Sequence, residues 1–429
     1  MQRLLMSCLF LLPSLLFAQD TPGENAPKNW FDDWTVKPIL AVQGWGTYTM
    51  GHEDYDPDTD AYLPTDDRLN FMIRRLRFGS TAQIGDRLFI KFLGAADFVG
   101  TDQRAGTVGG VNNGGFPNAQ IWDIFAQYKI SRTSEALYVI GGYLRPPIGR
   151  ESMSGALGVS SFEKSWTQWY VRQHLVGTGP GGTGGVYLGG LVPLAEKVHL
   201  DYRGGVFNAQ NSGISAGRET SSLLVGRVNF MFGDAESTTW TYGLPAANSF
   251  GRRNTFAVAL NVATEGGTQS APAGIGLLGV DAVANYGMFH VEGEYHRMMR
   301  GAENDDRYNS STYAIRAGYN FVMSTNDPDR PRYLEPTAMV YGFVGTTDAV
   351  EYPTVVATSF FGGTETVYDI GVNYHVDPGK IRLGLHYVGR TGDIGDLPAD
   401  GRLSWHNMQN GIGGIRRGDY VGFEVILAY

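Results

Sequence analysis

The chain ends in the sequence VGFEVILAY, residues 421–429, which carries the clearest strand signal in the protein. The apolar residues at every second position are Val421, Phe423, Val425, Leu427 and Tyr429. Successive side chains of a β-strand point to opposite faces, so this spacing predicts a strand with one entirely apolar face. Ile426 is the exception on the second face, and the chain stops on an aromatic residue.

The same alternation recurs along the chain. Leu76 and Phe78 share one face of a predicted strand, and Arg75 and Arg77 share the other. Farther along, Trp122 falls on the apolar face of another predicted strand. Segments with this period predict strands near residues 35–50, 71–84, 87–98, 120–130, 136–147, 182–194, 198–208, 221–232, 254–264, 273–285, 288–300, 310–322, 334–345, 366–376, 381–390 and 418–429. The fold class is therefore expected to be all-β.

The connections between these segments alternate between short and long. Gly85 and Asp86 form a tight turn, whereas residues 148–181 form a long loop. Short turns at one end and long loops at the other are the layout of a transmembrane antiparallel β-barrel, here of about 16 strands. One connection, residues 233–253, is long where a short turn should fall. It is either a large periplasmic turn or a missed hairpin, which leaves fourteen and eighteen strands open.

The first residues indicate export from the cytoplasm. Arg3 precedes an apolar stretch, residues 4–17, that ends at Ala18, as in a secretory signal peptide. We therefore expect a signal peptide at residues 1–18, a periplasmic N-terminal segment at 19–34 and the barrel at 35–429. The single cysteine, Cys8, lies in the apolar stretch, so the mature chain should contain no disulfide.

Composition and hydropathy narrow the class of protein further. The formal net charge of −9 argues against nucleic-acid binding. No second apolar run has the length and continuity of a membrane helix, so a membrane location requires strands. Only helices and closed barrels satisfy all backbone polar groups in lipid. The 59 glycines and the 12% of aromatic residues are typical of many closely packed strands with aromatic side chains facing lipid.

Three stretches resemble the phosphate-selective porin O and P family of Gram-negative outer-membrane porins. The first is RRLRFG, residues 74–79, followed by a strand that ends in Ala96-Asp97-Phe98. The second is GGYLRPP, residues 141–147, followed by FEKS at 162–165. The third is the terminal strand, which also resembles the C-terminal strand that the barrel-assembly machinery recognises in bacterial outer-membrane proteins.

The resemblance implies a sixteen-stranded, homotrimeric barrel in the outer membrane of a Gram-negative bacterium, surrounded by lipid and lipopolysaccharide. The loop 148–181 would fold into the lumen and narrow it, with a short helical turn around residues 165–175. Anion selectivity in this family comes from basic side chains that face the channel. At the matching positions this sequence has Arg75, Arg77 and Arg145, with Lys164 in the loop.

Alternation places further charged side chains on the inner face. The candidate pore-lining or anion-binding residues are Arg75, Arg77, Lys91, Arg145, Lys164, Arg203, Arg227, Arg316 and Arg382. Guanidinium groups bind phosphate or carboxylate in a bidentate way, and rings of basic residues select anions in pores. Carboxylates such as Asp97, Asp123 and Asp201 also face inward. The alternative is therefore a lumen wall of mutually paired charges that only keeps the channel wet.

Other constellations carry weaker signals. His290, Glu292, Glu294 and His296 occupy alternate positions of one strand, where a polar lumen stripe is favoured over a metal site. The acidic residues within 53–67 indicate a solvated extracellular loop in preference to a calcium site. The sequence contains no nucleophile elbow and no paired catalytic motif. No enzyme activity, metal or cofactor is therefore predicted.

The sequence as a whole predicts a porin for passive diffusion of small hydrophilic solutes, with anions such as phosphate as candidates. The alternative is a non-conducting outer-membrane barrel that acts as an adhesin or surface-binding protein through its long loops. A third reading, a secreted array of soluble β-sandwiches, would need repeats of fixed period that the sequence lacks. Trp166, Trp169 and Tyr170 could contact sugars in the constriction, but packing of the loop against the wall is favoured.

Overall fold

A computed structural model describes residues 33–102, 118–208, 221–268, 270–303, 306–323, 331–407 and 414–429. The predicted signal peptide and almost all of the segment 19–34 lie outside the described residues, so both stay predictions. The barrel belongs to the compact unit Val36–Tyr429.

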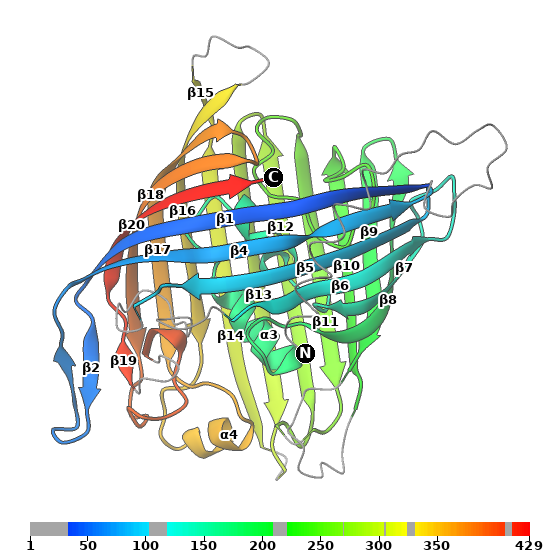
Figure 1. The fold of residues 1–429 in the computed structure, drawn as a ribbon. Helices are drawn as coiled ribbons and strands as arrows, with labels where there is room; N and C mark the ends of the chain where they lie inside the picture. Colours follow the sequence, from blue (N-terminus) through cyan, green and yellow to red (C-terminus); the bar gives the residue numbers. More distant parts are fainter. Residues whose placement is uncertain are drawn as a thin grey trace, which may run out of the picture. The chain divides into compact units, whose positions relative to one another are not determined.

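The barrel wall is one antiparallel sheet that closes on itself (Figure 1). Its strands are β1 (Trp34–Met50), β4 (Arg68–Ile84), β5 (Leu88–Val99), β6 (Gln120–Lys129), β7 (Tyr138–Leu144), β8 (Thr183–Ala195), β9 (Val198–Phe207), β10 (Leu223–Gly233), β11 (Thr255–Glu265), β12 (Ile275–Tyr286), β13 (Phe289–Gly301), β14 (Arg307–Tyr319) with its continuation β15 (Phe321–Met323), β16 (Arg332–Val344), β17 (Thr364–Asp377), β18 (Ile381–Asp393) and β20 (Asp419–Ala428). Pairing of β1 with β20 closes the ring, with Gly44 opposite Val425. The wall has sixteen strand positions, which confirms the predicted number.

The remaining shorter elements are not part of the barrel wall. A separate small sheet consists of β2 (Glu53–Asp56), β3 (Ala61–Pro64) and β19 (Ile415–Arg416). The helices are α2 (Arg150–Met153), η3 (Ala156–Gly158), α3 (Thr167–Val176), α4 (Tyr352–Ala357) and η4 (Trp405–Asn407). Within the described ranges, none of the helices has the length and hydropathy of a membrane span.

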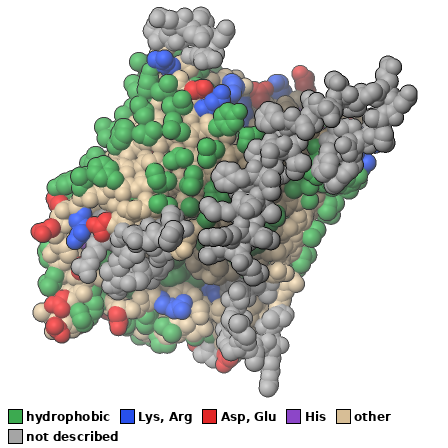
Figure 2. Space-filling model, viewed as in Figure 1, with side chains coloured by type: hydrophobic (Ala, Val, Ile, Leu, Met, Phe, Trp, Pro, Cys, Tyr) green, Lys and Arg blue, Asp and Glu red, His purple; other side chains and the backbone are tan. Residues whose placement is uncertain are grey.

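The two faces of the wall differ as the alternation predicts. On β20, Phe423 is 49% exposed on the outer face, whereas its neighbour Glu424 is completely buried. Ile426, the exception in the sequence pattern, lies on the inner face and is buried. On the face shown in Figure 2, hydrophobic side chains spread over the strands and charged side chains lie mostly towards the ends. An apolar outer face and a polar interior are the requirements of a barrel in lipid.

The outer face provides a test of the lipid contact. Leu260 lies in the middle of β11 and is 60% exposed, so Leu260→Arg would place a guanidinium in the hydrocarbon region. We expect the free energy of unfolding of the membrane-inserted barrel to fall by about 2–4 kcal/mol. The matched change Tyr286→Arg, at the last residue of β12, should cost about 0–1 kcal/mol. Urea titrations in lipid vesicles measure both, and equal losses would contradict this orientation.

Two irregularities break the alternation. Phe98 has a left-handed φ of 60°, and its ring lies 4.0 Å from the guanidinium of Arg74. Arg74 is buried beside Arg75 instead of facing lipid. The register between β5 and β6 shifts at a bulge that contains Trp122. Its ring lies 4.5 Å from the guanidinium of Arg77, which is an inward-facing residue. The prediction that Trp122 lies on the apolar face is therefore wrong, because a bulge inserts one residue and re-aims the side chain.

The long connection at the short-turn end is a single excursion of the chain. It occupies residues 234–254, between β10 and β11, and those two strands pair directly with Gly233 opposite Thr255. The described residues therefore resolve the open alternatives: this is one large turn and no hairpin was missed.

Candidate pore-lining site

The constriction loop, residues 148–181, carries α2, η3 and α3 and lies inside the ring of strands (Figure 1). The α3 helix confirms the helical turn expected near residues 165–175. It ends at Gly177, whose left-handed φ of 77° lets its backbone N–H donate to the carbonyl of Gln173. Glycine adopts this conformation without the steric cost of a Cβ atom, which explains why the helix stops there.

The first half of the constriction loop binds the wall strands β11, β13 and β14. The backbone N–H of Gly149 donates to Asn261 at 3.0 Å. Glu151 forms an ion pair with Arg316 at 2.8 Å, and its backbone N–H donates to Glu294 at 2.9 Å. These partners all face inward, so the loop is held within the lumen.

The middle of the constriction loop reaches strands β1 and β4. Phe162 is fully buried and stacks on Trp45 with ring centroids 4.3 Å apart. The adjacent Glu163 forms an ion pair with Arg74 at 2.6 Å and a second ion pair with Arg75. The loop therefore carries a carboxylate to a pair of wall arginines, which is the arrangement that a buried charge requires.

Aromatic side chains fix the second half of the constriction loop. Tyr170 on α3 stacks on Phe343 of β16 with ring centroids 4.1 Å apart. Trp166 stacks in the same way on Trp405 at 4.4 Å. The geometry supports the packing interpretation of these residues, because aromatic neighbours occupy the ring faces that a sugar would need.

A second segment enters the lumen from the opposite end. We call residues 234–254 the turn insert. Asn248 donates to Glu335 of β16 at 2.9 Å, and Asn285 of β12 donates to the carbonyl of Ala247 at 2.6 Å. Trp240 is buried against the wall. The turn insert therefore lines the inside of the barrel.

The turn insert and the constriction loop contact each other directly. Arg150 forms an ion pair with Glu236 at 2.7 Å. The backbone N–H of Leu244 donates to the carbonyl of Met153 at 3.3 Å, in an isolated β-bridge region that joins the two segments. The lumen is thus narrowed by two segments that arrive from its two ends.

The predicted basic residues lie on the inner side, and eight of the nine form ion pairs with carboxylates. The pairs are Arg75–Glu163, Arg77–Asp97, Lys91–Asp123, Arg145–Asp123, Arg203–Asp201, Arg227–Asp281, Arg316–Glu292 and Arg382–Glu424. The pairs are spread around the barrel, so the nine residues do not form one continuous ladder. This arrangement supports the alternative of a wall of paired charges for most of them.

Three of the predicted residues come together in one basic cluster. We define the basic cluster as Arg77, Lys91 and Arg145, with Asp123 and Trp122 between them. Asp123 lies 3.1 Å from Lys91 and 3.0 Å from Arg145. The Trp122 ring lies 4.5 Å and 5.2 Å from the guanidinium groups of Arg77 and Arg145. The Lys91 side chain keeps 23% of its surface exposed, so water reaches the cluster.

Lys164 has a different environment from the other eight. Its ammonium donates to the carbonyl of Ser154 at 2.8 Å and to that of Glu151. Burial lowers the pKa of Lys164 to about 7, although the charge of Glu151 opposes this shift. The ammonium joins residue 164 to the carbonyls of Glu151 and Ser154 earlier in the constriction loop, and the side chain is almost completely buried.

Several interior charges were not among the predicted residues. Arg74 is turned inward at the β4 irregularity, and Glu163 and Glu236 come from the two lumen segments. Glu335 of β16 accepts from His290 and His375, both at 2.7 Å. The alternation of β16 could have predicted that Glu335 faces inward. Loop residues such as Glu163 and Glu236 have no periodic pattern that places them in the lumen.

The two groups of side chains with weaker sequence signals, the polar stripe on β13 and the acidic region, have ordinary structural roles. The four residues His290, Glu292, Glu294 and His296 face inward, where Glu292 pairs with Arg316 and Glu294 accepts from Thr167 at 2.9 Å. In the ranges that the structure describes, no group of three His, Cys, Asp or Glu residues is arranged to hold a metal. The acidic region forms the β2–β3 hairpin, in which Thr59 donates to Asp56 at 2.8 Å.

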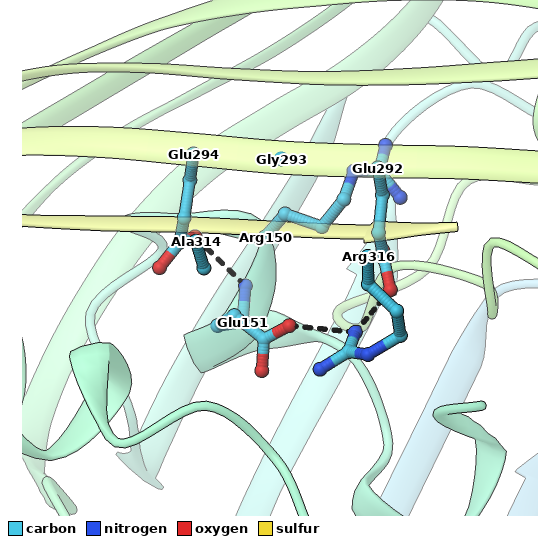
Figure 3. Close-up of a pocket in the computed structure, with 7 residues that line it drawn as sticks. All are labelled: Arg150, Glu151, Glu292, Gly293, Glu294, Ala314 and Arg316. Carbon is cyan, nitrogen blue, oxygen red and sulfur yellow. Dashed lines mark hydrogen bonds and ion pairs between the residues drawn. The ribbon is translucent and has the colours of Figure 1, made fainter. Parts of the chain in front are cut away.

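A small cavity separates the constriction loop from β13 and β14 (Figure 3). Its volume is about 10 Å³, close to the least volume that holds one water molecule. The lining residues are Arg150, Glu151, Glu292, Gly293, Glu294, Ala314 and Arg316. Glu151 points to Arg316 within this group, at 2.8 Å. Packing at this point leaves no space for a solute, so a solute path must run elsewhere.

Comparisons with known proteins support the fold. No protein-family model and no curated protein matches the sequence. Similar solved structures include OmpF of Salmonella typhi, with a TM-score of 0.53 and 10% identity, covering 94% of this chain and 100% of that chain. The outer-membrane channel DcaP of Acinetobacter baumannii has a TM-score of 0.52 and 13% identity, and the match covers 94% of this chain and 100% of that chain. An anion-selective porin from Comamonas acidovorans has a TM-score of 0.51 and 11% identity, and the match covers 92% of this chain and 100% of that chain.

These likenesses define the class of protein. The chain is a sixteen-stranded transmembrane β-barrel with the fold of Gram-negative outer-membrane porins. Identities of this size establish the fold and no finer relationship. The resemblance to phosphate-selective porins in particular stays a prediction.

Proposed function

We propose that the protein is a porin of the Gram-negative outer membrane that lets small hydrophilic solutes diffuse passively and prefers anions. The observation that supports an anion preference is the basic cluster. Its three cations pair with two carboxylates, those of Asp97 and Asp123, and the Lys91 side chain keeps 23% of its surface exposed. Phosphate is one candidate solute, because guanidinium and ammonium groups bind its oxygens with charge-assisted hydrogen bonds.

The position of the cluster fits a solute path along strands β4 to β6. The constriction loop and the turn insert bury the charged side chains elsewhere on the wall, including Arg203, Arg227 and Arg316. A charge that water reaches acts on passing ions, whereas a buried and paired charge mainly stabilises the wall. The selectivity should therefore depend on Lys91 and its neighbours more than on the number of arginines in the lumen.

Charge reversal at Lys91 tests the anion preference. We expect Lys91→Glu to move the reversal potential in a potassium chloride gradient towards the cation-selective side, because the net charge of the three cations and the two carboxylates, Asp97 and Asp123, changes from +1 to −1. Planar-bilayer recordings measure this potential, and repeating them in potassium phosphate tests phosphate against chloride.

The control for this experiment makes the same change outside the lumen. Lys380 lies in the short turn after β17, and its side chain is 65% exposed. Lys380→Glu should leave the reversal potential unchanged. Equal shifts in both variants would show that Lys91 has no special place in the path. Failure of the unaltered barrel to conduct any ion would instead favour the adhesin or surface-binding alternative.

The proposal also covers the oligomeric state of the protein and its partners in the membrane. A homotrimer in outer-membrane lipid, contact with lipopolysaccharide and recognition of the terminal strand by the barrel-assembly machinery are all compatible with the fold. The proposed recognition rests on the apolar alternation of the last strand, in which Phe423 and Leu427 are about half exposed on the outer face. Cross-linking of the folded protein in membranes would measure the number of subunits.

A further inference from the structure

The Trp240 side chain anchors the turn insert on the inner face of the wall. The Trp240 ring stacks on Tyr138 with centroids 4.9 Å apart and lies over Gly189 of β8. A Cβ atom at Gly189 would approach the indole to 2.1 Å, so only glycine leaves room for this ring. The backbone N–H of Trp240 donates to Glu135 at 2.9 Å, and its indole N–H donates to Asp201 at 3.4 Å. Both N–H groups of Trp240 therefore have a hydrogen-bond partner.

The remainder of the turn insert is fastened at several further points. Arg253 donates to the carbonyls of Glu236 and Ala246, at 2.8 Å and 2.6 Å, and so closes the insert on itself. Asn248 is bonded to Asn320 at 3.0 Å as well as to Glu335. A segment with this density of buried hydrogen bonds keeps one position, unlike an ordinary exposed turn.

The insert also contacts the basic cluster. The hydroxyl of Tyr242 accepts from the backbone N–H of Arg145 at 3.0 Å, and its ring lies 6.0 Å from the Arg145 guanidinium. Arg145 is the first residue after β7 and leads into the constriction loop. Tyr242 therefore holds the exact point where a wall strand becomes that loop. Glu236 holds the next arginine of the loop, Arg150, through their ion pair.

We propose that the turn insert is a fixed second constriction element, anchored by Trp240, in which Tyr242 is a positioning residue for Arg145. The inference rests on the proposed pore function. A solute then passes a filter whose two sides come from opposite ends of the barrel. The geometry of a basic site depends on the shell that holds it, so loss of the anchor should change selectivity as well as pore width.

The anchor is tested by Trp240→Ala. The variant is expected to conduct severalfold more than the unaltered barrel, with a reversal potential closer to zero, because the insert and Arg145 lose their fixed positions. Tyr295→Ala, which removes an aromatic ring from the outer face, should leave both quantities unchanged. Tyr242→Phe removes only the hydroxyl that binds Arg145. It is expected to shift the reversal potential with little change in conductance, which a purely structural role would not produce.

A disulfide between the two lumen segments tests whether they stay together during conduction. A Cβ atom on Gly158 would lie 3.2 Å from that of Ala246, close to the separation in disulfides of about 3.5–4.5 Å. The single native cysteine, Cys8, lies in the expected signal peptide. Oxidised Gly158→Cys/Ala246→Cys should conduct like the reduced form. The same disulfide in the Trp240→Ala background should restore conductance and selectivity, and reductant should abolish the rescue.

The outcomes separate this inference from the pore function. Loss of conductance on oxidation would overturn the inference, because the two segments would then have to part for solutes to pass. Unchanged conductance and selectivity in folded Trp240→Ala would overturn it as well. Absence of conductance in every variant, including Trp240→Ala, would overturn the pore function itself. Heat-modifiable migration on gels confirms that each barrel is folded.

Discussion

Replacement of residues 150–179 by a short glycine–serine linker is expected to raise the single-channel conductance several-fold. The constriction loop crosses the lumen from the end of β7 to Glu294 of β13 and Phe343 of β16, on the far side of the ring. A sixteen-stranded wall without such a segment encloses a wide aqueous channel. Removal of the loop also leaves Arg74 and Arg75 open to water, so anion preference should persist in the wider pore.

A matched deletion distinguishes a lumen segment from a surface segment. Residues 53–64 form the β2–β3 hairpin, which belongs to the separate small sheet and not to the wall. Its replacement by the same linker should leave the conductance unchanged. A conductance that stays constant after loss of the constriction loop would contradict its place in the solute path. The measurement is made on single channels in planar bilayers, with folding checked by heat-modifiable migration.

The wall could be predicted from sequence because lipid imposes a strict pattern on it. All sixteen predicted strands correspond to wall strands, and β9 at Val198–Phe207 lies within one residue of its predicted range. Each residue that faces lipid must be apolar, so the pattern survives even in short segments. The prediction fails only where a strand loses its period. The bulge at Trp122 is such a place, because nothing in the local sequence marks the inserted residue.

The interior of the lumen could be predicted only in part. Arg75 and Arg77 face inward as predicted, because the alternation of β4 fixes their side. Their partners differ in origin: Asp97 comes from the neighbouring strand, whereas Glu163 comes from a loop. A strand partner follows from register, but a loop partner depends on the path of the chain through the lumen. The unusual length of residues 234–254 was visible in the sequence, but the inward course of the turn insert was not.

The largest expected loss of stability follows from Asp281→Ala. Arg227 is completely buried and is held by the Asp281 carboxylate through two hydrogen bonds, at 2.7 Å and 3.1 Å. Asn261 donates to the same carboxylate at 2.9 Å, and Arg150 lies 3.7 Å from it. Removal of one partner of a buried ion pair costs about 3–5 kcal/mol, because a charged group remains buried without compensation. We expect a loss of that size in the free energy of unfolding.

The control variant removes an aspartate from an exposed pair. Asp377 lies 3.6 Å from Lys380, and the two side chains are 43% and 65% exposed. Exposed pairs contribute about 0–1 kcal/mol, so Asp377→Ala should have a small effect. Urea titrations of the barrel in detergent or lipid, followed by tryptophan fluorescence, give both free energies. Equal losses at the two positions would show that water solvates the Arg227 guanidinium in the folded barrel.

A double variant identifies the physical cause of the loss. If the penalty comes from the guanidinium left without a carboxylate, removal of that guanidinium in Arg227→Met/Asp281→Ala should recover part of the stability. If the penalty comes from lost packing around Asp281, the second substitution should add to the first. Arg150 would retain its ion pair with Glu236 in either case, which limits the change to the wall between β10 and β12. Recovery would show that the paired lumen charges are needed because they neutralise one another inside the barrel, whichever ions pass through it.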